Sequence, residues 1–297
     1  MCHQFVCFML EDDNVPYELI QGRQKYVRRS AAPFRTLYQQ LKMSTGWDFS
    51  SFASSAAMHK LHPYVDLFVE TLQKDLWDAM RNDDGLAVNQ ALRRFRKYAR
   101  SDIVRRQVAN HERKVRKQVE GRLLYVEKLF TIEPYLTVVY LQFANRPDPG
   151  ASNTQDVSPA AQLRSQFNAF VKHRTRVLPT SVGYVTKISH RLDAGFYLDV
   201  MFFFCASELR HGVELAEVIG RQWVAETITG TFCGANAMSV ANSAPWARRL
   251  GRIASSDTST RGLVVDLAEC FVSTDFYLRS SVPDSIRVHT RCPLPAR

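Results

Sequence analysis

The stretch Gly183–Phe204 constrains the fold of this chain more than any other. Two runs rich in aromatic and β-branched residues, 183–189 and 196–204, flank a short polar turn, which is the pattern of a β-hairpin. Gly195 ends the turn, where it can adopt a positive φ. Residues 200–205 are apolar without a break, which indicates a strand buried on both faces. The chain is therefore predicted to form a sheet with helices packed on it.

Other periodic segments predict elements on both sides of this hairpin. Apolar residues recur at helical spacing between residues 63 and 130, and Asp84 is a predicted N-cap for a helix over 86–98. Tyr135–Phe143 is predicted as a strand, bounded by Pro134 and by the Pro- and Gly-containing stretch 145–150. Beyond it we predict helices at 160–176, 208–226 and 263–271, loops at 229–251 and 254–260, and an extended C-terminal tail.

This order of elements predicts an α+β fold. A helical, strongly basic N-terminal region over residues 1–130 is followed by an α+β domain over 131–297, whose sheet is mainly antiparallel with packed helices.

Positive charge is concentrated in one segment of the chain. Between Val88 and Lys128, thirteen Lys or Arg face four Asp or Glu, so this segment holds nearly all of the net charge of +10. Such density favours an anionic partner, first of all nucleic acid, although a solvated helical face is the alternative. The candidate nucleic-acid contacts are Arg93, Arg94, Arg96, Lys97, Arg100, Arg105, Arg106, Arg113, Lys114, Arg116, Lys117 and, on the hairpin, Lys187.

The cysteines and the apolar runs argue against two classes of protein. None of the six cysteines forms a Cys-x-x-Cys pair, so a zinc site has little support, and Cys205 and Cys270 are predicted core thiols. Without a disulfide framework the chain fits a reducing, cytoplasmic setting. No apolar run reaches the roughly 18–20 residues that a membrane helix needs, and no membrane partner is expected.

The hairpin also carries a resemblance to a known family. Gly183, Tyr184, Val185, Lys187, Asp193, Gly195, Phe196 and the apolar run after them stand where they do in the replication-initiator-like domain of inovirus and prophage proteins, the YagK/YfjJ C-terminal type. That family is a divergent relative of rolling-circle (HUH) nickases. The resemblance implies a replication-initiator-like sheet of ferredoxin-like topology, an origin in phage or prophage, and binding of single-stranded or hairpin DNA.

The positions that would carry nickase chemistry are replaced in this chain. The family has two histidines at i and i+2 of the second strand, where this chain has Tyr197 and Asp199, and a glutamate on the first strand, where it has Ser189. Cys270 stands at the nucleophilic tyrosine and Ser273 at a lysine, while Tyr140 and Gln142 replace an Arg-x-Asp. The resemblance therefore implies a catalytically degenerate DNA-binding protein with no catalytic residue, no metal and no cofactor.

Two other functions remain open on the sequence. One is an active nickase that uses Mg²⁺ or Mn²⁺, with Tyr277 or Tyr197 as the nucleophile and His190 or His211 near the metal. His190 follows Ser189 directly and is expected on the opposite face of the strand, which weakens this hypothesis. The other is a protein-interaction subunit of a defence or regulatory complex, whose basic helices meet an acidic partner.

Overall fold

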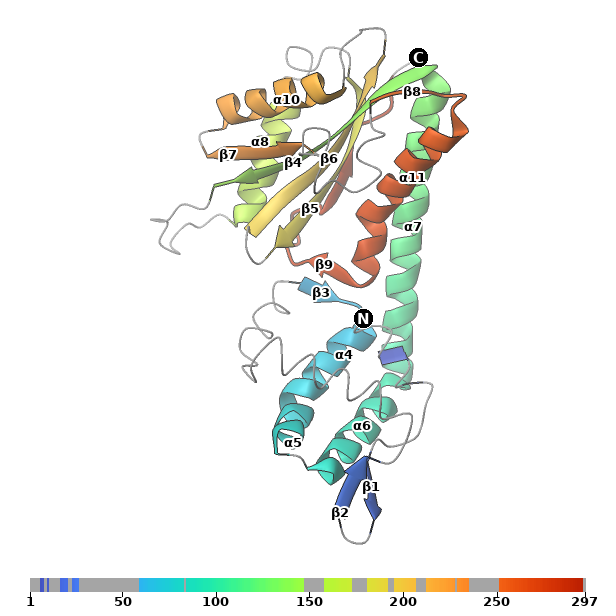
Figure 1. Cartoon of the computed structure of the whole chain (residues 1–297), viewed down its shortest axis with the longest axis vertical. Coiled ribbons are helices and arrows are strands. Elements are labelled where there is room, and N and C mark those ends of the chain that lie inside the picture. The colour runs from blue at the N-terminus through green and yellow to red at the C-terminus, as the bar shows by residue number, and fades with distance from the viewer. Residues whose placement is uncertain are drawn as a thin grey trace. The chain divides into compact units, whose positions relative to one another are not determined.

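The computed structural model of the chain is an α+β protein of helices and antiparallel sheets (Figure 1). It divides into two compact units: Met1–Val115 with Phe276–Arg279, and Arg116–Asp275 with Ser280–Arg297. The sequence-based division at residue 130 stays a prediction. The structure describes residues 6–7, 10, 17–20, 23–26, 59–82, 84–146, 158–172, 181–191, 195–206, 212–227, 229–234 and 251–295.

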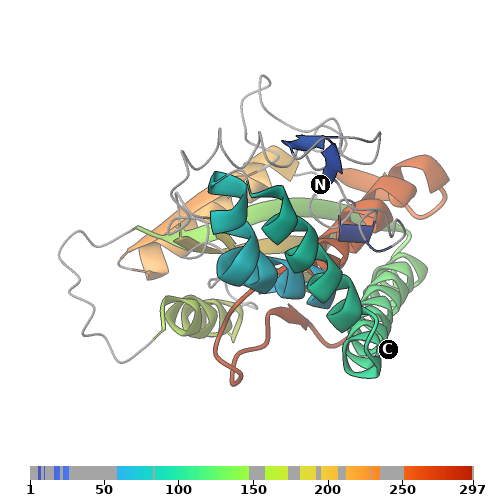
Figure 2. The same cartoon turned by 90° about the horizontal axis from the view of Figure 1, so that it is seen from below.

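The first unit contains a small helical core. Phe68 and Phe95 meet edge to face at 5.6 Å between ring centroids, among buried aliphatic side chains. Asp84 caps α6 by accepting a hydrogen bond from the Ala87 amide at 3.0 Å, as the sequence predicts. The helices α4 and α6 pack side by side, blue and teal in Figure 2. The elements are β1 (Tyr17–Ile20), β2 (Arg23–Tyr26), β3 (His59–Leu61), α4 (Pro63–Thr71), a π-helical stretch (Leu72–Leu76), α5 (Trp77–Arg81), α6 (Gly85–Ala99) and β9 (Leu278–Ser280), which pairs with β3.

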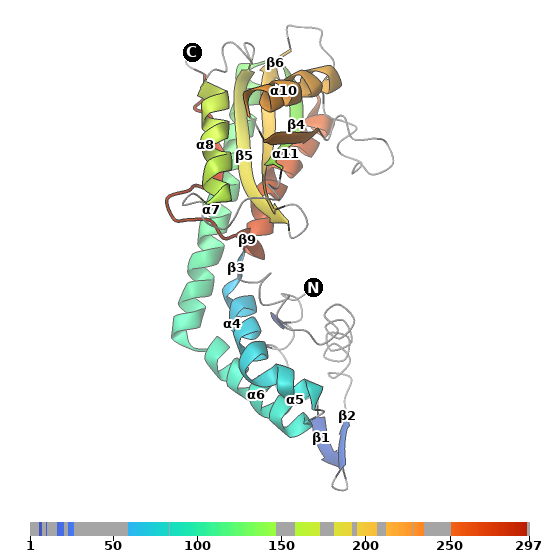
Figure 3. The same cartoon turned by 90° about the vertical axis from the view of Figure 1, so that its left-hand side faces the viewer.

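The second unit is built on a six-stranded antiparallel sheet. Its order is β10-β5-β6-β4-β7, and β8 also pairs with β4. The predicted hairpin is confirmed: β5 and β6 pair antiparallel, and Gly195 has φ = +70°. Figure 3 shows these two strands side by side. The bounds are β4 (Tyr135–Asn145), β5 (Ser181–Arg191), β6 (Gly195–Cys205), β7 (Gly230–Gly234), β8 (Arg252–Ala254) and β10 (His289–Arg291).

Helices cover both faces of this sheet (Figure 1). On one face lie α8 (Pro159–Lys172) and α10 (Gly212–Glu226), where Phe143 stacks on Trp223 at 4.6 Å between ring centroids. On the other lie α11 (Thr258–Ser273) and the C-terminal half of α7 (Asp102–Ile132). Because β6 is an internal strand between these layers, residues 200–204 of the predicted buried run 200–205 are buried, whereas Cys205, predicted as a core thiol, is half-buried.

Three local predictions were wrong. The predicted loop 229–251 contains β7. The tail predicted as extended contains the strand β10, whose pairing with β5 was not predicted. Helix α11 begins at Thr258 inside the predicted loop 254–260, because the Asp257 carboxylate accepts a hydrogen bond from the Thr260 amide and caps it. Cys270 is exposed, since α11 turns it away from the sheet.

Within the residues that the structure describes, no helix has both the length and the apolar character needed to cross a bilayer.

The aromatic layer between β4 and α10 predicts a large stability effect. Phe143 is fully buried against Phe167, Phe202 and Trp223, so Phe143→Ala is expected to lower the free energy of unfolding by about 3–5 kcal/mol. The control Val218→Ala changes an exposed residue of α10 and should stay within about 0.5 kcal/mol of the parent. Chemical denaturation measures both, and equal losses would contradict this account of the core.

Candidate functional site

A row of polar side chains crosses the sheet of the second unit on the face covered by α7 and α11. In the strand register Gln142 of β4 lies opposite Asp199 of β6, and Asp199 lies opposite Lys187 of β5. Lys187 in turn lies opposite His289 of β10. Because side chains alternate between the faces of a sheet, this register puts all four on one face. We call Gln142, Asp199, Lys187 and His289 the polar row.

The carboxylate at the centre of the polar row is enclosed by donors from its own chain. Asp199 is 7% exposed, and its Oδ1 accepts hydrogen bonds from the Tyr140 hydroxyl at 2.5 Å and Gln142 Nε2 at 2.8 Å. Its Oδ2 accepts from the Ser189 hydroxyl at 2.9 Å. Burial raises the pKa of Asp199, and the three hydrogen bonds offset only part of that rise. Burial and the neighbouring Asp199 also raise the pKa of Tyr140, which therefore remains a donor.

The other end of the polar row holds a second buried carboxylate. Asp275, directly after α11, pairs with Lys187 Nζ at 2.8 Å and with His289 Nε2 at 2.7 Å, and Lys187 also donates to the Thr274 hydroxyl. Burial favours a higher pKa for Asp275, but the hydrogen bond and charge of His289 and the charge of Lys187 outweigh it and hold the pKa below its usual value. Burial lowers the pKa of His289.

The arrangement balances charge internally, since Lys187 lies between the two carboxylates. The Asp199 oxygens accept hydrogen bonds from hydroxyl and amide donors, and the Asp275 oxygens pair with an ammonium and an imidazole. Among the described residues, no group of three or more His, Cys, Asp and Glu is placed to hold a metal ion. Such a site orders side chains across four strands, and its buried carboxylates are not open to a substrate.

The structure brings together only some of the residues expected at a degenerate nickase centre. Tyr197 shares the face of Asp199 and lies under the Arg191 guanidinium, 5.1 Å from its ring centroid. Ser189 joins the Asp199 cluster, whereas Cys270 is exposed and Ser273 is half-buried near the end of α11.

The residues of the active-nickase alternative are spread more widely. His190 packs on Phe196 on the opposite face from Ser189, as predicted. Tyr277 is exposed and belongs to the other compact unit, and His211 lies outside the described residues.

Two residues that the sequence did not single out belong to the polar row or contact it. His289 stands on β10, a three-residue strand without an alternating pattern, and Thr274, which accepts from Lys187, follows the end of α11. Asp275 matches an aspartate of the family in the resemblance, and its local sequence carries no other signal. No local signal joins residues about 100 positions apart, so their pairing with Lys187 was not predictable from spacing.

Most of the predicted nucleic-acid contacts are exposed. On α6 these are Arg93, Arg94 and Lys97, followed by Arg100; on α7 they are Arg105, Arg106, Arg113, Lys114, Arg116 and Lys117. At ~100° per residue, the six on α7 cover about half of the helix circumference, opposite the side that buries Val108 and Val115. We call these six the basic face of α7.

Two predicted contacts are placed elsewhere. Arg96 is 5% exposed and Lys187 is 7% exposed, so neither can meet a polyanion at the surface. Arg96 turns inward because it shares the apolar side of α6 with Leu92 and Ala99, and Lys187 is held by Asp275.

No family model, no curated protein and no solved structure matches this chain. Function must therefore be argued from the polar row and the basic face of α7 themselves.

Removing Lys187, the cation of the polar row, should destabilise the fold because Asp275 loses its ion-pair partner. Lys187→Met leaves Asp275 buried without its ammonium partner and is expected to cost about 3–5 kcal/mol of unfolding free energy. Adding Asp275→Asn should recover part of that loss, because the unpaired charge is then gone. Lys172→Met on the exposed side of α8 is the control, and a loss for Lys187→Met no larger than this control would contradict the assignment.

The depressed pKa of Asp275 fixes the sign of a pH effect. Its ionised form contributes stability that is fully present above the ordinary Asp pKa and is lost as the pH falls through the folded value, below about pH 4. Asp199 acts in the opposite sense, because its pKa is raised. Unfolding free energy measured against pH should therefore fall less steeply below about pH 4 in Asp275→Asn than in the parent. Parallel curves would show that Asp275 is not held ionised by its partners.

Proposed function

We propose that this protein binds DNA, preferably single-stranded or hairpin DNA, through the basic face of α7, on a replication-initiator-like scaffold whose catalytic centre is degenerate. One observation carries the proposal. Between Arg105 and Lys117 a single helix exposes six cations, and the one acid in that span is Glu112.

The electrostatics of this face suit a phosphate backbone. Thirteen helical residues extend about 18 Å, roughly the axial length of five nucleotides of one strand. Cations at this density repel one another in water, and a polyanion relieves the repulsion while it releases its condensed counterions. Contacts of this kind position a strand but read no sequence, so the proposed binding is governed by charge and by the shape of the DNA.

The sheet topology supports the initiator part of the proposal. The connectivity β4-α8-β5-β6-α10-β7, with neighbours in the order β5-β6-β4-β7, follows the β-α-β-β-α-β pattern of ferredoxin-like sheets. Tyr197 and Asp199 stand on an inner strand, on the face where α11 packs. The strands therefore match the arrangement expected from the resemblance to the inovirus and prophage family, whereas Cys270, at the nucleophile position, is exposed and turned away from the sheet.

The state of Asp199 supports the degenerate part of the proposal. A carboxylate binds a divalent ion through oxygen lone pairs that point toward the metal. Here both oxygens accept hydrogen bonds from Tyr140, Gln142 and Ser189, and Lys187 already supplies the nearby positive charge.

DNA binding can be tested by charge reversal on α7. Fluorescence anisotropy with labelled single-stranded and hairpin DNA should show affinity that falls steeply with salt. Arg113→Glu with Lys114→Glu should weaken binding and reduce the slope of log affinity against log salt by about 0.7 for each lost contact to a single strand. The control Arg146→Glu with Arg221→Glu changes the same charge at exposed sites just after β4 and on α10 and should bind like the parent.

Two results would overturn the proposal. Equal binding by the two double variants would remove the basic face of α7 as the interface. A covalent protein–DNA adduct on a denaturing gel, after incubation with labelled single-stranded DNA and Mn²⁺ or Mg²⁺, would show that the centre is active.

A further inference from the structure

A basic hollow in the second unit lies beside one end of the polar row, and His289 of that row is part of its wall. It has a volume of about 500 Å³ and lies between α7 and the segment Arg287–Pro293. Five of its lining residues carry basic side chains, and none of the lining residues is Asp or Glu. Because α7 and this segment are about 170 positions apart in sequence, the hollow exists only in the fold. Its basic side chains are Lys117, Arg122, Arg287, His289 and Arg291.

Arg122 is the most constrained of these side chains. It is 6% exposed, its Nη2 donates a long hydrogen bond of 3.4 Å to the Thr186 carbonyl, and its guanidinium lies 5.9 Å from the Phe271 ring centroid. Its Nη1 is buried and has no hydrogen-bond partner. Burial lowers the pKa of Arg122 to about 10. A buried guanidinium with an unsatisfied donor costs free energy, and an anionic acceptor beside it would recover that cost.

The negative charge nearest in effect to Arg122 is shared with other basic side chains of the protein. The carboxylate that acts on Arg122 is Asp275, which also pairs with Lys187 and His289. Four permanent cations line the hollow, and the carboxylate that acts on Arg122 is already paired with Lys187 and His289. His289 Nδ1, at the wall of the hollow, also lacks a hydrogen-bond partner.

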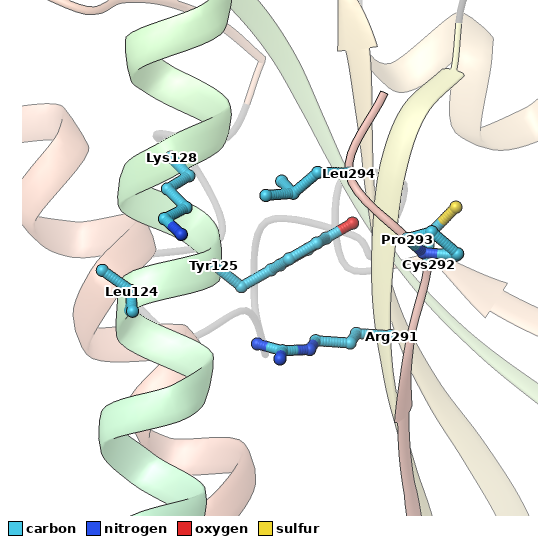
Figure 4. Close-up of a pocket in the computed structure, with 7 residues that line it drawn as sticks. All are labelled: Leu124, Tyr125, Lys128, Arg291, Cys292, Pro293 and Leu294. Atoms are coloured by element: carbon cyan, nitrogen blue, oxygen red, sulfur yellow. The ribbon is translucent and has the colours of Figure 1, made fainter. Parts of the chain in front are cut away.

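A smaller apolar hollow adjoins the basic one. It has a volume of about 220 Å³ and shares Arg291, Cys292 and Pro293 with it. Figure 4 shows Tyr125 reaching from α7 toward Leu294, with the Arg291 side chain alongside. The Arg291 guanidinium lies 5.4 Å from the Tyr125 ring centroid, and its Nη1 donates to the Gly121 carbonyl at 2.5 Å. A ligand with an anionic end and a less polar body would fit across both hollows.

We propose that the basic hollow binds the phosphate of a 5′-nucleotide, a phosphate monoester carried by a free mononucleotide or by the 5′ end of a strand. A monoester carries nearly two negative charges at neutral pH and three acceptor oxygens, which match guanidinium groups that converge from different sides. A backbone diester offers one charge and two free oxygens. If the bound phosphate belongs to the 5′ end of a DNA strand, this inference rests on the proposed DNA binding. If it belongs to a free mononucleotide, it does not.

Calorimetric titration of the full chain tests the site with dAMP, inorganic phosphate and deoxyadenosine. We expect dAMP to bind, phosphate to bind more weakly, and deoxyadenosine not to bind. Arg287→Gln and Arg122→Gln should each weaken dAMP about tenfold or more, the value of one charge-assisted hydrogen bond. Arg287 is exposed, so its variant decides the question if Arg122→Gln does not fold. Arg146→Gln, away from the hollow, should bind dAMP like the parent.

The two sources separate in a second measurement. If the protein binds a 5′-phosphorylated oligonucleotide more tightly than a 5′-hydroxyl one, and Arg287→Gln loses this preference, the site binds a DNA end. If the two oligonucleotides bind equally, the site binds the free nucleotide. Arg113→Glu with Lys114→Glu should leave dAMP binding intact, so failure of the α7 interface and failure of this site are distinguishable. Absence of dAMP binding, or equal affinity in the parent and Arg287→Gln, overturns the proposal.

Discussion

The desolvation of Asp199 is the constraint on which the second unit depends. An internal strand must bury both faces, and a carboxylate on one of them is costly unless donors surround it. The chain meets this cost with Tyr140 and Gln142 from β4 and Ser189 from β5. These hydrogen bonds form in only one strand register, because a slip of one residue would turn the donors to the opposite face of the sheet. The polar cluster therefore specifies how β4, β5 and β6 align, while the apolar layers supply most of the stability.

The same constraint links the sheet to the elements that surround it. Lys187 lies opposite Asp199 in the strand register. It pairs with Asp275 just after α11, and Asp275 also pairs with His289 on β10. The alignment of the central strands thus sets where the last helix ends and where the C-terminal segment pairs. That segment forms one wall of the basic hollow, so the hollow is a consequence of the charge arrangement inside the sheet.

Sequence patterns predicted the parts of the fold whose signals are local. The turn glycine at 195, the cap at Asp84 and the apolar run at 200–205 each act within a few residues. The first two predictions were confirmed, and the third holds for residues 200–204, since Cys205 is half-buried. β10 was missed because a three-residue edge strand gains its pairing only from the finished sheet. Cys270 was a misread local signal, since the helical spacing of Val264, Ala268 and Phe271 already directs it outward. Arg122 and His289 could not be recognised, because their environment is assembled from distant segments.

The distribution of charge separates two kinds of surface in this protein. At the sheet, the carboxylates of Asp199 and Asp275 are met by donors and cations of the chain itself. On the basic face of α7 the excess is positive, with six cations and one acid between Arg105 and Lys117, and no Asp or Glu lines the basic hollow. Reactive sites usually hold groups whose pKa values are set for proton transfer or for a metal. Here the carboxylates with perturbed pKa values are enclosed by donors, whereas the unsatisfied nitrogens at the basic hollow belong to the basic side chains Arg122 and His289. Such a pattern favours a protein that holds phosphates over one that transforms them.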